Sequence, residues 1–154
     1  EMDRGTSIII YLPVLREFSS FDDAHKPDLI KRGSGLVLVV DDEMMIRTIA
    51  RDILQQCGYD VMMAADGEEA LNIFRDRRDE INLVLLDMAM PRKNGIETYE
   101  EMKLIKGDVA VLLSSGFQLD DKVQTALDLG IKGFIQKPYT MDGLSNAVYD
   151  ILYK

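Results

Sequence analysis

Five side chains suited to phosphoryl chemistry stand at the ends of short apolar segments of the sequence. Two adjacent aspartates, Asp41 and Asp42, directly follow one aliphatic run, and Asp87 follows another. Ser115 and Lys137 close two further runs. Mg²⁺ commonly binds one or two carboxylates together with a phosphate, and a carboxylate can itself attack phosphorus. Because a lysine and a hydroxyl can contact the phosphate oxygens, the five residues are suited to a phosphoryl-transfer site.

The hydrophobic pattern predicts the elements that must position these residues. From Leu36 onward, strand-length apolar runs alternate with longer segments of helical period, which is typical of an α/β domain with a parallel sheet. The first, third and fourth runs are almost wholly aliphatic, as expected of central strands covered on both faces. We predict strands at 36–40, 60–65, 82–86, 109–113 and 133–136.

Five helices are predicted between and after these strands. An apolar stripe that begins at Ile46 is stopped by Gly58, and Asp66 is a predicted helix N-cap. The pair Asp66–Gly67 is also a hairpin signal, but the helical pattern after it favours the N-cap. The third helix is expected over about 96–105. The fourth is expected to end at Gly130, and the fifth is expected to begin at Thr140.

In an open parallel sheet, polar chemistry gathers beyond the carboxyl ends of the strands, where the following helices begin. All five polar residues are predicted to lie at that edge. Three crowded carboxylates repel one another, and either raised pKa values or a bound cation relieves the repulsion. We expect a hard divalent cation, Mg²⁺ or Mn²⁺, held by Asp42 and Asp87, with room for a phosphoryl group beside Lys137 and Ser115.

Each signal has a plainer interpretation when it is taken alone. Two adjacent aspartates most often face solvent or cap a helix, by odds of roughly four to one over a metal site. A lysine before a proline is most often a surface residue, and a serine is common at a strand end. The site hypothesis therefore depends on the whole set of residues, each of which falls at the end of a predicted strand and in the right order along the chain. The plainer interpretations do not predict this coincidence.

Composition narrows the class of partner. Lys and Arg number 18 against 27 Asp and Glu, a net charge of −9, which disfavours binding to nucleic acid or to an anionic membrane surface. The single cysteine, Cys57, cannot form an internal disulfide and suits a reducing, cytoplasmic location. No apolar run approaches the roughly 18 residues that a membrane span needs. The sequence opens on Glu1, so we expect a piece of a longer protein that could itself be membrane-anchored.

Four motifs resemble those of one known family. The segments "VVDDE", "LLDMAMPRKNG", "VLLSSGF" and "GFIQKPY" occur in the order and at the spacing of the receiver domain of two-component signalling proteins, the response regulators. The resemblance covers Leu36 to Lys154. It implies a flavodoxin-like (βα)5 fold, with a five-stranded parallel sheet of order 2-1-3-4-5 and helices on both faces.

The resemblance also implies a role for each motif residue. Asp87 would be the phosphate acceptor. Mg²⁺ would be bound by the side chains of Asp42 and Asp87 and by the carbonyl of Ala89. Asp41 would act mostly through a metal-bound water.

Three further residues carry implied roles in the response to phosphate. Ser115 and Lys137 would contact the phosphoryl group. Phe134 would be the switch aromatic, which rotates inward when Ser115 moves towards the phosphate. A domain of this kind catalyses only its own phosphorylation and dephosphorylation.

The front of the chain carries a second, shorter resemblance. "GTSIIIYLP" is similar to the segment that closes the ATP-binding domain of histidine kinases. This implies three parts: 1–17 as the remnant of an upstream domain, 18–35 as a linker, and 36–154 as the receiver. The parent would then be a hybrid sensor histidine kinase, a phosphotransferase, and the alternative is a stand-alone or differently fused response regulator.

Two expectations follow from this arrangement. His25 lacks the flanking residues of a kinase phosphorylation box, so the phosphodonor would be a histidine kinase dimerisation domain or a histidine phosphotransfer protein outside this chain. The segment 7–12 is β-branched, aromatic and uncharged, and a strand separated from its own sheet is a template for pairing. We therefore expect it to be disordered or to dock on a neighbouring molecule.

Two other classes of protein remain as alternatives. A phosphatase of the haloacid dehalogenase type also uses an aspartate after a strand, but it needs a second acid two residues later, where Ala89 stands. A flavodoxin-like nucleotide binder needs a glycine-rich loop after the first strand. The corresponding segment here is "DDEMM", which is acidic and would repel a phosphate.

Overall fold

The computed structural model describes residues 30–116 and 121–154 of the chain. The predicted upstream remnant at 1–17, most of the predicted linker, His25 and the predicted self-association of 7–12 lie outside these residues. They therefore stay predictions.

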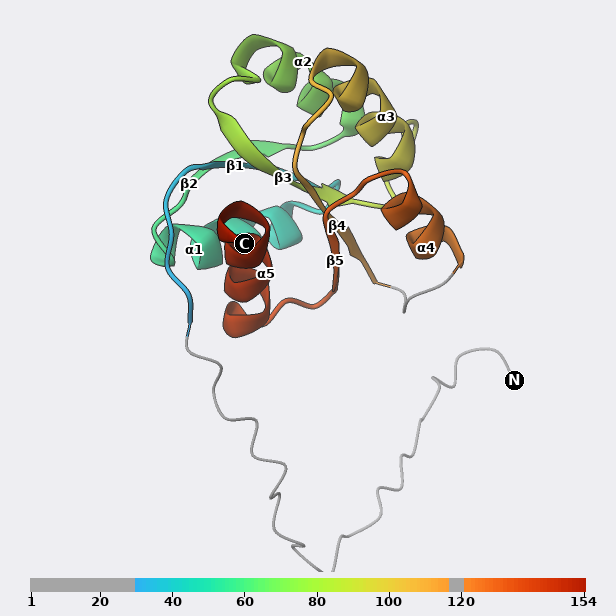
Figure 1. Ribbon diagram of the computed structural model, residues 1–154. Coiled ribbons are helices and arrows are strands. Elements are labelled where there is room, and N and C mark those ends of the chain that lie inside the picture. The colour runs from blue at the N-terminus through green and yellow to red at the C-terminus, as the bar shows by residue number, and fades with distance from the viewer. Residues whose placement is uncertain (1–29, 117–120) are drawn as a thin grey trace, which may run out of the picture.

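Strands and helices alternate without exception through the described part of the chain (Figure 1). This is the pattern that the sequence predicts for an α/β domain. The elements are β1 (Leu36–Val40), α1 (Met44–Gln56), β2 (Asp60–Ala64), α2 (Gly67–Arg77), β3 (Ile81–Asp87), α3 (Gly95–Ile105), β4 (Val111–Ser115), α4 (Asp121–Asp128), β5 (Gly133–Gln136) and α5 (Met141–Tyr153).

The five strands form one parallel sheet of order β2-β1-β3-β4-β5. This confirms the predicted flavodoxin-like fold. The strands β1, β3 and β4 are central and almost wholly buried, whereas the edge strands β2 and β5 are largely half-exposed. The aliphatic composition of the three central runs therefore has the expected cause, which is burial on both faces.

Helices cover both faces of the sheet and create two separate cores (Figure 1). One core lies under α1 and α5 and includes Leu54 and Leu144. The other lies under α2, α3 and α4 and includes Phe74, Met102 and Ala126. Within the described residues, no helix is both long enough and apolar enough to cross a membrane.

The predicted helix ends are confirmed by their geometry. The Asp66 side chain accepts a hydrogen bond from the Glu69 N–H, as an N-cap should. Gly58 follows α1 with φ of 98° and Gly130 follows α4 with φ of 107°, a left-handed conformation that glycine adopts easily. These caps fix where each helix starts and stops relative to the sheet edge.

One predicted strand is displaced. The sequence predicts the fourth strand at 109–113, but β4 runs from Val111 to Ser115. The Val109 N–H donates to the carbonyl of Lys106 in the turn after α3, so Val109 cannot join the ladder although its side chain is buried. An apolar residue can therefore belong to the core from a turn, and the strand ends two residues later than its aliphatic run.

Candidate phosphoryl-acceptor site

The strand order brings the predicted site residues to one edge of the sheet. Asp41 directly follows β1, Asp87 is the last residue of β3, Ser115 is the last residue of β4, and Lys137 directly follows β5. Carboxylate oxygens of Asp41, Asp42 and Asp87 lie within 4.8 Å of one another. Residues separated by almost a hundred positions thus form one cluster because their strands are neighbours.

Lys137 is the cation of this cluster. Its ammonium lies 2.6 Å from Asp41 Oδ2 and 2.9 Å from Asp87 Oδ1. The three side chains are only 2 to 12% exposed, so water screens these ion pairs little. Asp41 is held further through its Oδ1, which accepts a hydrogen bond from the Glu43 N–H at 2.9 Å.

Burial and ion pairing oppose each other in the titration of Asp87. Burial raises the pKa of the Asp87 carboxyl, and the hydrogen bond and charge of Lys137 only partly offset this. Burial would lower the pKa of Lys137, but its contacts with Asp41 and Asp87 outweigh that effect, so its pKa lies above the usual value. The lysine therefore stays charged at neutral pH.

The donor set fits a hard divalent cation. It consists of carboxylate oxygens alone, which suits Mg²⁺ or Mn²⁺ and not the softer metals that prefer cysteine and histidine. Asp41 and Asp87 are buried whereas Asp42 is exposed, so the cluster opens to solvent on the Asp42 side. A small hydrated ion can reach the carboxylates from that side.

The loop after Asp87 is fixed against the end of β3. A Cβ on Gly95 would lie 2.4 Å from the Asp87 carbonyl oxygen, so only glycine lets α3 begin this close. Asn94 and Glu97 form a reciprocal capping box at the start of α3. The short loop that carries Ala89 is therefore held at both ends.

The remaining predicted residues lie near the cluster in different ways. Ser115 is buried at the end of β4, and its carbonyl accepts the Lys137 N–H at 2.8 Å. Ala89 is exposed in the loop. Phe134 pairs with Leu113 in the sheet and packs, half-buried, against the core under α2, α3 and α4, so its side chain is not part of the acidic cluster.

Some groups that surround the acidic cluster were not predicted from the sequence. The backbone N–H groups of Glu43 and Ala89 donate to Asp41 and Asp87, and no side-chain pattern reveals a backbone donor. Tyr139 lies two residues after Lys137, and burial raises its pKa to about 12. The only hint of Tyr139 in the sequence is that an aromatic residue directly follows Lys137 and the proline after it.

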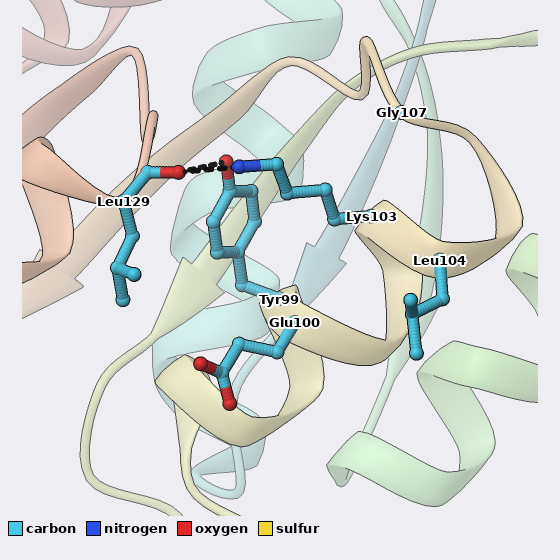
Figure 2. Close-up of a pocket in the computed structure, with 6 residues that line it drawn as sticks. All are labelled: Tyr99, Glu100, Lys103, Leu104, Gly107 and Leu129. Carbon is cyan, nitrogen blue, oxygen red and sulfur yellow. Dashed lines mark hydrogen bonds between the residues drawn. The ribbon is translucent and has the colours of Figure 1, made fainter.

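A pocket of about 610 Å³ lies apart from this cluster, beside α3 (Figure 2). The Tyr99 hydroxyl and the Lys103 ammonium both donate to the carbonyl of Leu129, at 3.2 and 2.7 Å. Its rim includes Leu104, an 88% exposed leucine. The pocket shares no residue with the acidic cluster, and its polar groups tie α3 to the segment after α4.

Replacing Asp42 with alanine should change the response of the fold to metal. The variant loses one of three crowded carboxylates, so its melting temperature without metal should exceed that of the wild type. Saturating Mg²⁺ should stabilise the wild type by about 2.7 kcal/mol at 100 times its Kd and should leave the variant unchanged. Thermal melts with and without Mg²⁺ measure both effects. Asp108→Ala, at an exposed aspartate before β4, is the control, and an unchanged Mg²⁺ shift in Asp42→Ala would contradict the ligand assignment.

Comparison with known families assigns the class of protein. Residues 37–149 match the response regulator receiver domain family, and the chain belongs to this family. Receiver domains bind Mg²⁺ through acidic residues and interact with histidine kinases or phosphotransfer proteins that donate the phosphoryl group.

Curated relatives include proteins of different overall organisation. The chain is 38% identical over 116 residues to a probable transcriptional regulator, ycf27, of Porphyridium aerugineum, covering 75% of this chain and 47% of the relative. It is 34% identical to sporulation initiation phosphotransferase F of Bacillus subtilis, covering 73% of this chain and 89% of the relative. The match to the sensor kinase CckA of Brucella abortus, at 32% identity, covers 100% of this chain and 17% of the relative. The chain thus spans less than half of two of these proteins.

Solved structures agree with the fold. A chain of the CheX–CheY–BeF3–Mg²⁺ complex of Borrelia burgdorferi superposes with a TM-score of 0.75 at 28% identity, covering 78% of this chain and 90% of that one. A receiver domain protein of Clostridium thermocellum superposes with a TM-score of 0.73 at 30% identity, covering 77% and 94%.

Proposed function

We propose that the chain accepts a phosphoryl group from a phosphohistidine onto Asp87 in a reaction that depends on Mg²⁺ or Mn²⁺. The observation that carries this proposal is the environment of one carboxylate. Asp87 is 4% exposed, lies within 4.8 Å of two further carboxylates, and is paired at 2.9 Å with a buried lysine.

Each residue of the site has its own role in the proposed phosphoryl transfer. One carboxylate oxygen of Asp87 attacks phosphorus, the phosphorus–nitrogen bond of the phosphohistidine breaks, and the imidazole leaves with the electron pair and takes up a proton. The Lys137 ammonium offsets negative charge that develops on the phosphoryl oxygens. Asp42 and Asp87, with the Ala89 carbonyl, would hold a divalent cation, and Asp41 would act mostly through its bound water; such a cation would supply further positive charge to the phosphoryl oxygens.

The response to phosphorylation is assigned to two residues. Ser115 ends β4 one residue after Ser114, the register partner of Asp87, and is proposed to move towards the phosphoryl group. Phe134 is proposed to rotate into the space that Ser115 vacates. Its partial burial, on the strand next to Ser115, supports this assignment.

The context of the receiver is proposed to be a hybrid sensor histidine kinase of the cytoplasm, with or without a membrane anchor elsewhere in the parent. The support is the match to the sensor kinase CckA, which runs over the whole of this chain, including the part before the receiver. The donor or acceptor is then a histidine kinase dimerisation domain or a histidine phosphotransfer protein. The relatives named transcriptional regulators and phosphotransferase F favour the alternative, a stand-alone or differently fused response regulator.

Incubation with acetyl phosphate tests the proposed chemistry directly. In the presence of Mg²⁺, intact mass spectrometry should show one added phosphoryl group, and excess EDTA should prevent it. No adduct at any Mg²⁺ or Mn²⁺ concentration would contradict the proposal. Phosphotransfer profiling against the histidine phosphotransfer proteins of the source organism then identifies the partner.

A further inference from the structure

The six residues before β1, residues 30–35, lie against the receiver; we call them the strap. Its backbone is hydrogen-bonded at two successive residues. The Gly33 N–H donates to the carbonyl of Cys57, just after α1, at 3.0 Å. The Tyr153 hydroxyl, near the end of α5, accepts from the Ser34 N–H at 2.9 Å and donates to the Ser34 carbonyl at 2.8 Å. Pairing of this kind is typical of a docked segment and not of a free linker.

The start of the strap is held by one face of α5. The Lys31 ammonium contacts Asp150 Oδ1 at 2.5 Å and lies 5.4 Å from the centre of the Tyr149 ring. The Lys31 N–H donates to Asn146 Oδ1 at 3.3 Å. Asn146, Asp150 and Tyr153 are spaced by four and three residues, so they share one side of the helix. The strap therefore lies along a continuous stripe of α5.

The middle of the strap is packed without spare room. A Cβ on Gly33 would lie 2.3 Å from Tyr59 Oη and 2.8 Å from Tyr153 Cε2. A Cβ on Gly58 would lie 2.5 Å from the Gly33 carbonyl oxygen. Tyr59, which closes this contact, is only 2% exposed. Two glycines are thus required for the strap to approach the domain this closely.

We infer that this stripe of α5 is the docking surface for the receiver's own upstream chain, and that the strap fixes where that chain leaves the domain. The strap runs from the level of Asn146, near the middle of α5, to Tyr153 near the end of that helix, so the upstream chain leaves the domain alongside the middle of α5 and not at the start of β1.

The position of the exit has a consequence for phosphotransfer, and this consequence rests on the proposed function. If the chain is held as far as residue 30, a flexible tether to an upstream domain starts beside α5. If the strap were free, the tether would start at β1, and the upstream domain could reach a different volume around the receiver. A tethered donor in the same parent chain therefore starts from the α5 side of the domain, and from there it has to reach the edge that carries Asp87. The strap leaves that edge uncovered for donors from other molecules.

Amide hydrogen exchange measured by NMR on the full chain, without metal or phosphodonor, tests the docking itself. The Gly33 and Ser34 amides should be protected in the wild type. Gly33→Ala places a methyl group where two tyrosines leave no space, so exchange at Ser34 should become at least about tenfold faster. Gly107→Ala is the matched control, because a Cβ there meets nothing within 4 Å, and it should leave Ser34 unchanged.

A second pair of variants decides the question if Gly33→Ala unfolds the domain. Tyr153→Phe keeps the ring but removes both hydrogen bonds to Ser34, so exchange at Ser34 should again accelerate. Tyr149→Phe is its control, because the Tyr149 hydroxyl makes no hydrogen bond within the described residues.

Unprotected Gly33 and Ser34 amides in the wild type, or equal exchange in Tyr153→Phe and Tyr149→Phe, would overturn the inference. Failure of the proposed function is distinguishable, because it appears as a missing phosphoryl adduct in the mass spectrum of the same wild-type sample. The exchange experiment contains neither metal nor phosphodonor and does not depend on that result.

Discussion

Replacing Asp87 with asparagine should abolish phosphoryl uptake from acetyl phosphate. The amide has nearly the shape of the carboxylate but lacks its negative charge, so it is not a nucleophile towards phosphorus at neutral pH. The variant also loses one of the predicted metal ligands. The adduct seen by intact mass in the wild type should fall below detection in Asp87→Asn at equal protein and Mg²⁺ concentration.

The matched control for this experiment is Asp108→Asn, which makes the same chemical change at an exposed aspartate before β4. It should take up phosphate at the wild-type rate. Equal adducts in Asp87→Asn and the wild type would move the acceptor to another residue. Fragment mapping would then show whether Asp41 or Asp42 carries the phosphate, because both lie in the same cluster.

Replacing Lys137 with alanine should destabilise the fold by about 3 kcal/mol at neutral pH without metal. The change leaves the carboxylates of Asp41 and Asp87 buried with no cation beside them, and the loss of one partner of a buried ion pair is costly. Urea denaturation measures the free energy of unfolding. Added Mg²⁺ should restore part of the loss, since it supplies positive charge to the same carboxylates.

Two comparisons test the cause of this loss. Lys132→Ala removes an exposed lysine before β5 and should change stability by no more than about 0.5 kcal/mol. The deficit of Lys137→Ala should also shrink as pH falls, because the pKa of Asp87 is already raised and a protonated Asp87 needs no counter-charge. Equal stability of the two lysine variants would show that the ammonium does not offset the buried carboxylates.

The strand positions and the edge that carries the site could be predicted because both depend on local pattern. Four of the five strands lie within one residue of their predicted limits, and Asp87 and Lys137 were found because polar residues interrupt apolar runs there. The pattern does not tell which of two adjacent aspartates points inward. Successive side chains at a strand end face opposite ways, so the register decides that Asp41 is buried beside Lys137 while Asp42 is exposed.

The strap could not be predicted for a related reason. The sequence before β1 is polar and rich in glycine, as a linker is, and its partners on α5 lie more than a hundred residues later in the chain. On α5 those partners are an asparagine, an aspartate and a tyrosine, which are ordinary residues for the solvent face of a helix. Only the folded arrangement shows that this face is covered.

The placement of Lys137 directly after the last strand bears on how the domain is made. During synthesis the chain emerges from its amino end, so β1 and β3, with their three aspartates, are complete before β5 leaves the ribosome. Until then the acidic cluster has no ammonium to pair with, and its mutual repulsion opposes closure of the carboxyl edge. A fragment that ends before β5 therefore lacks both an edge strand and the counter-charge, and the carboxyl edge of a nascent receiver stays unpaired in both respects until β5 and Lys137 have emerged.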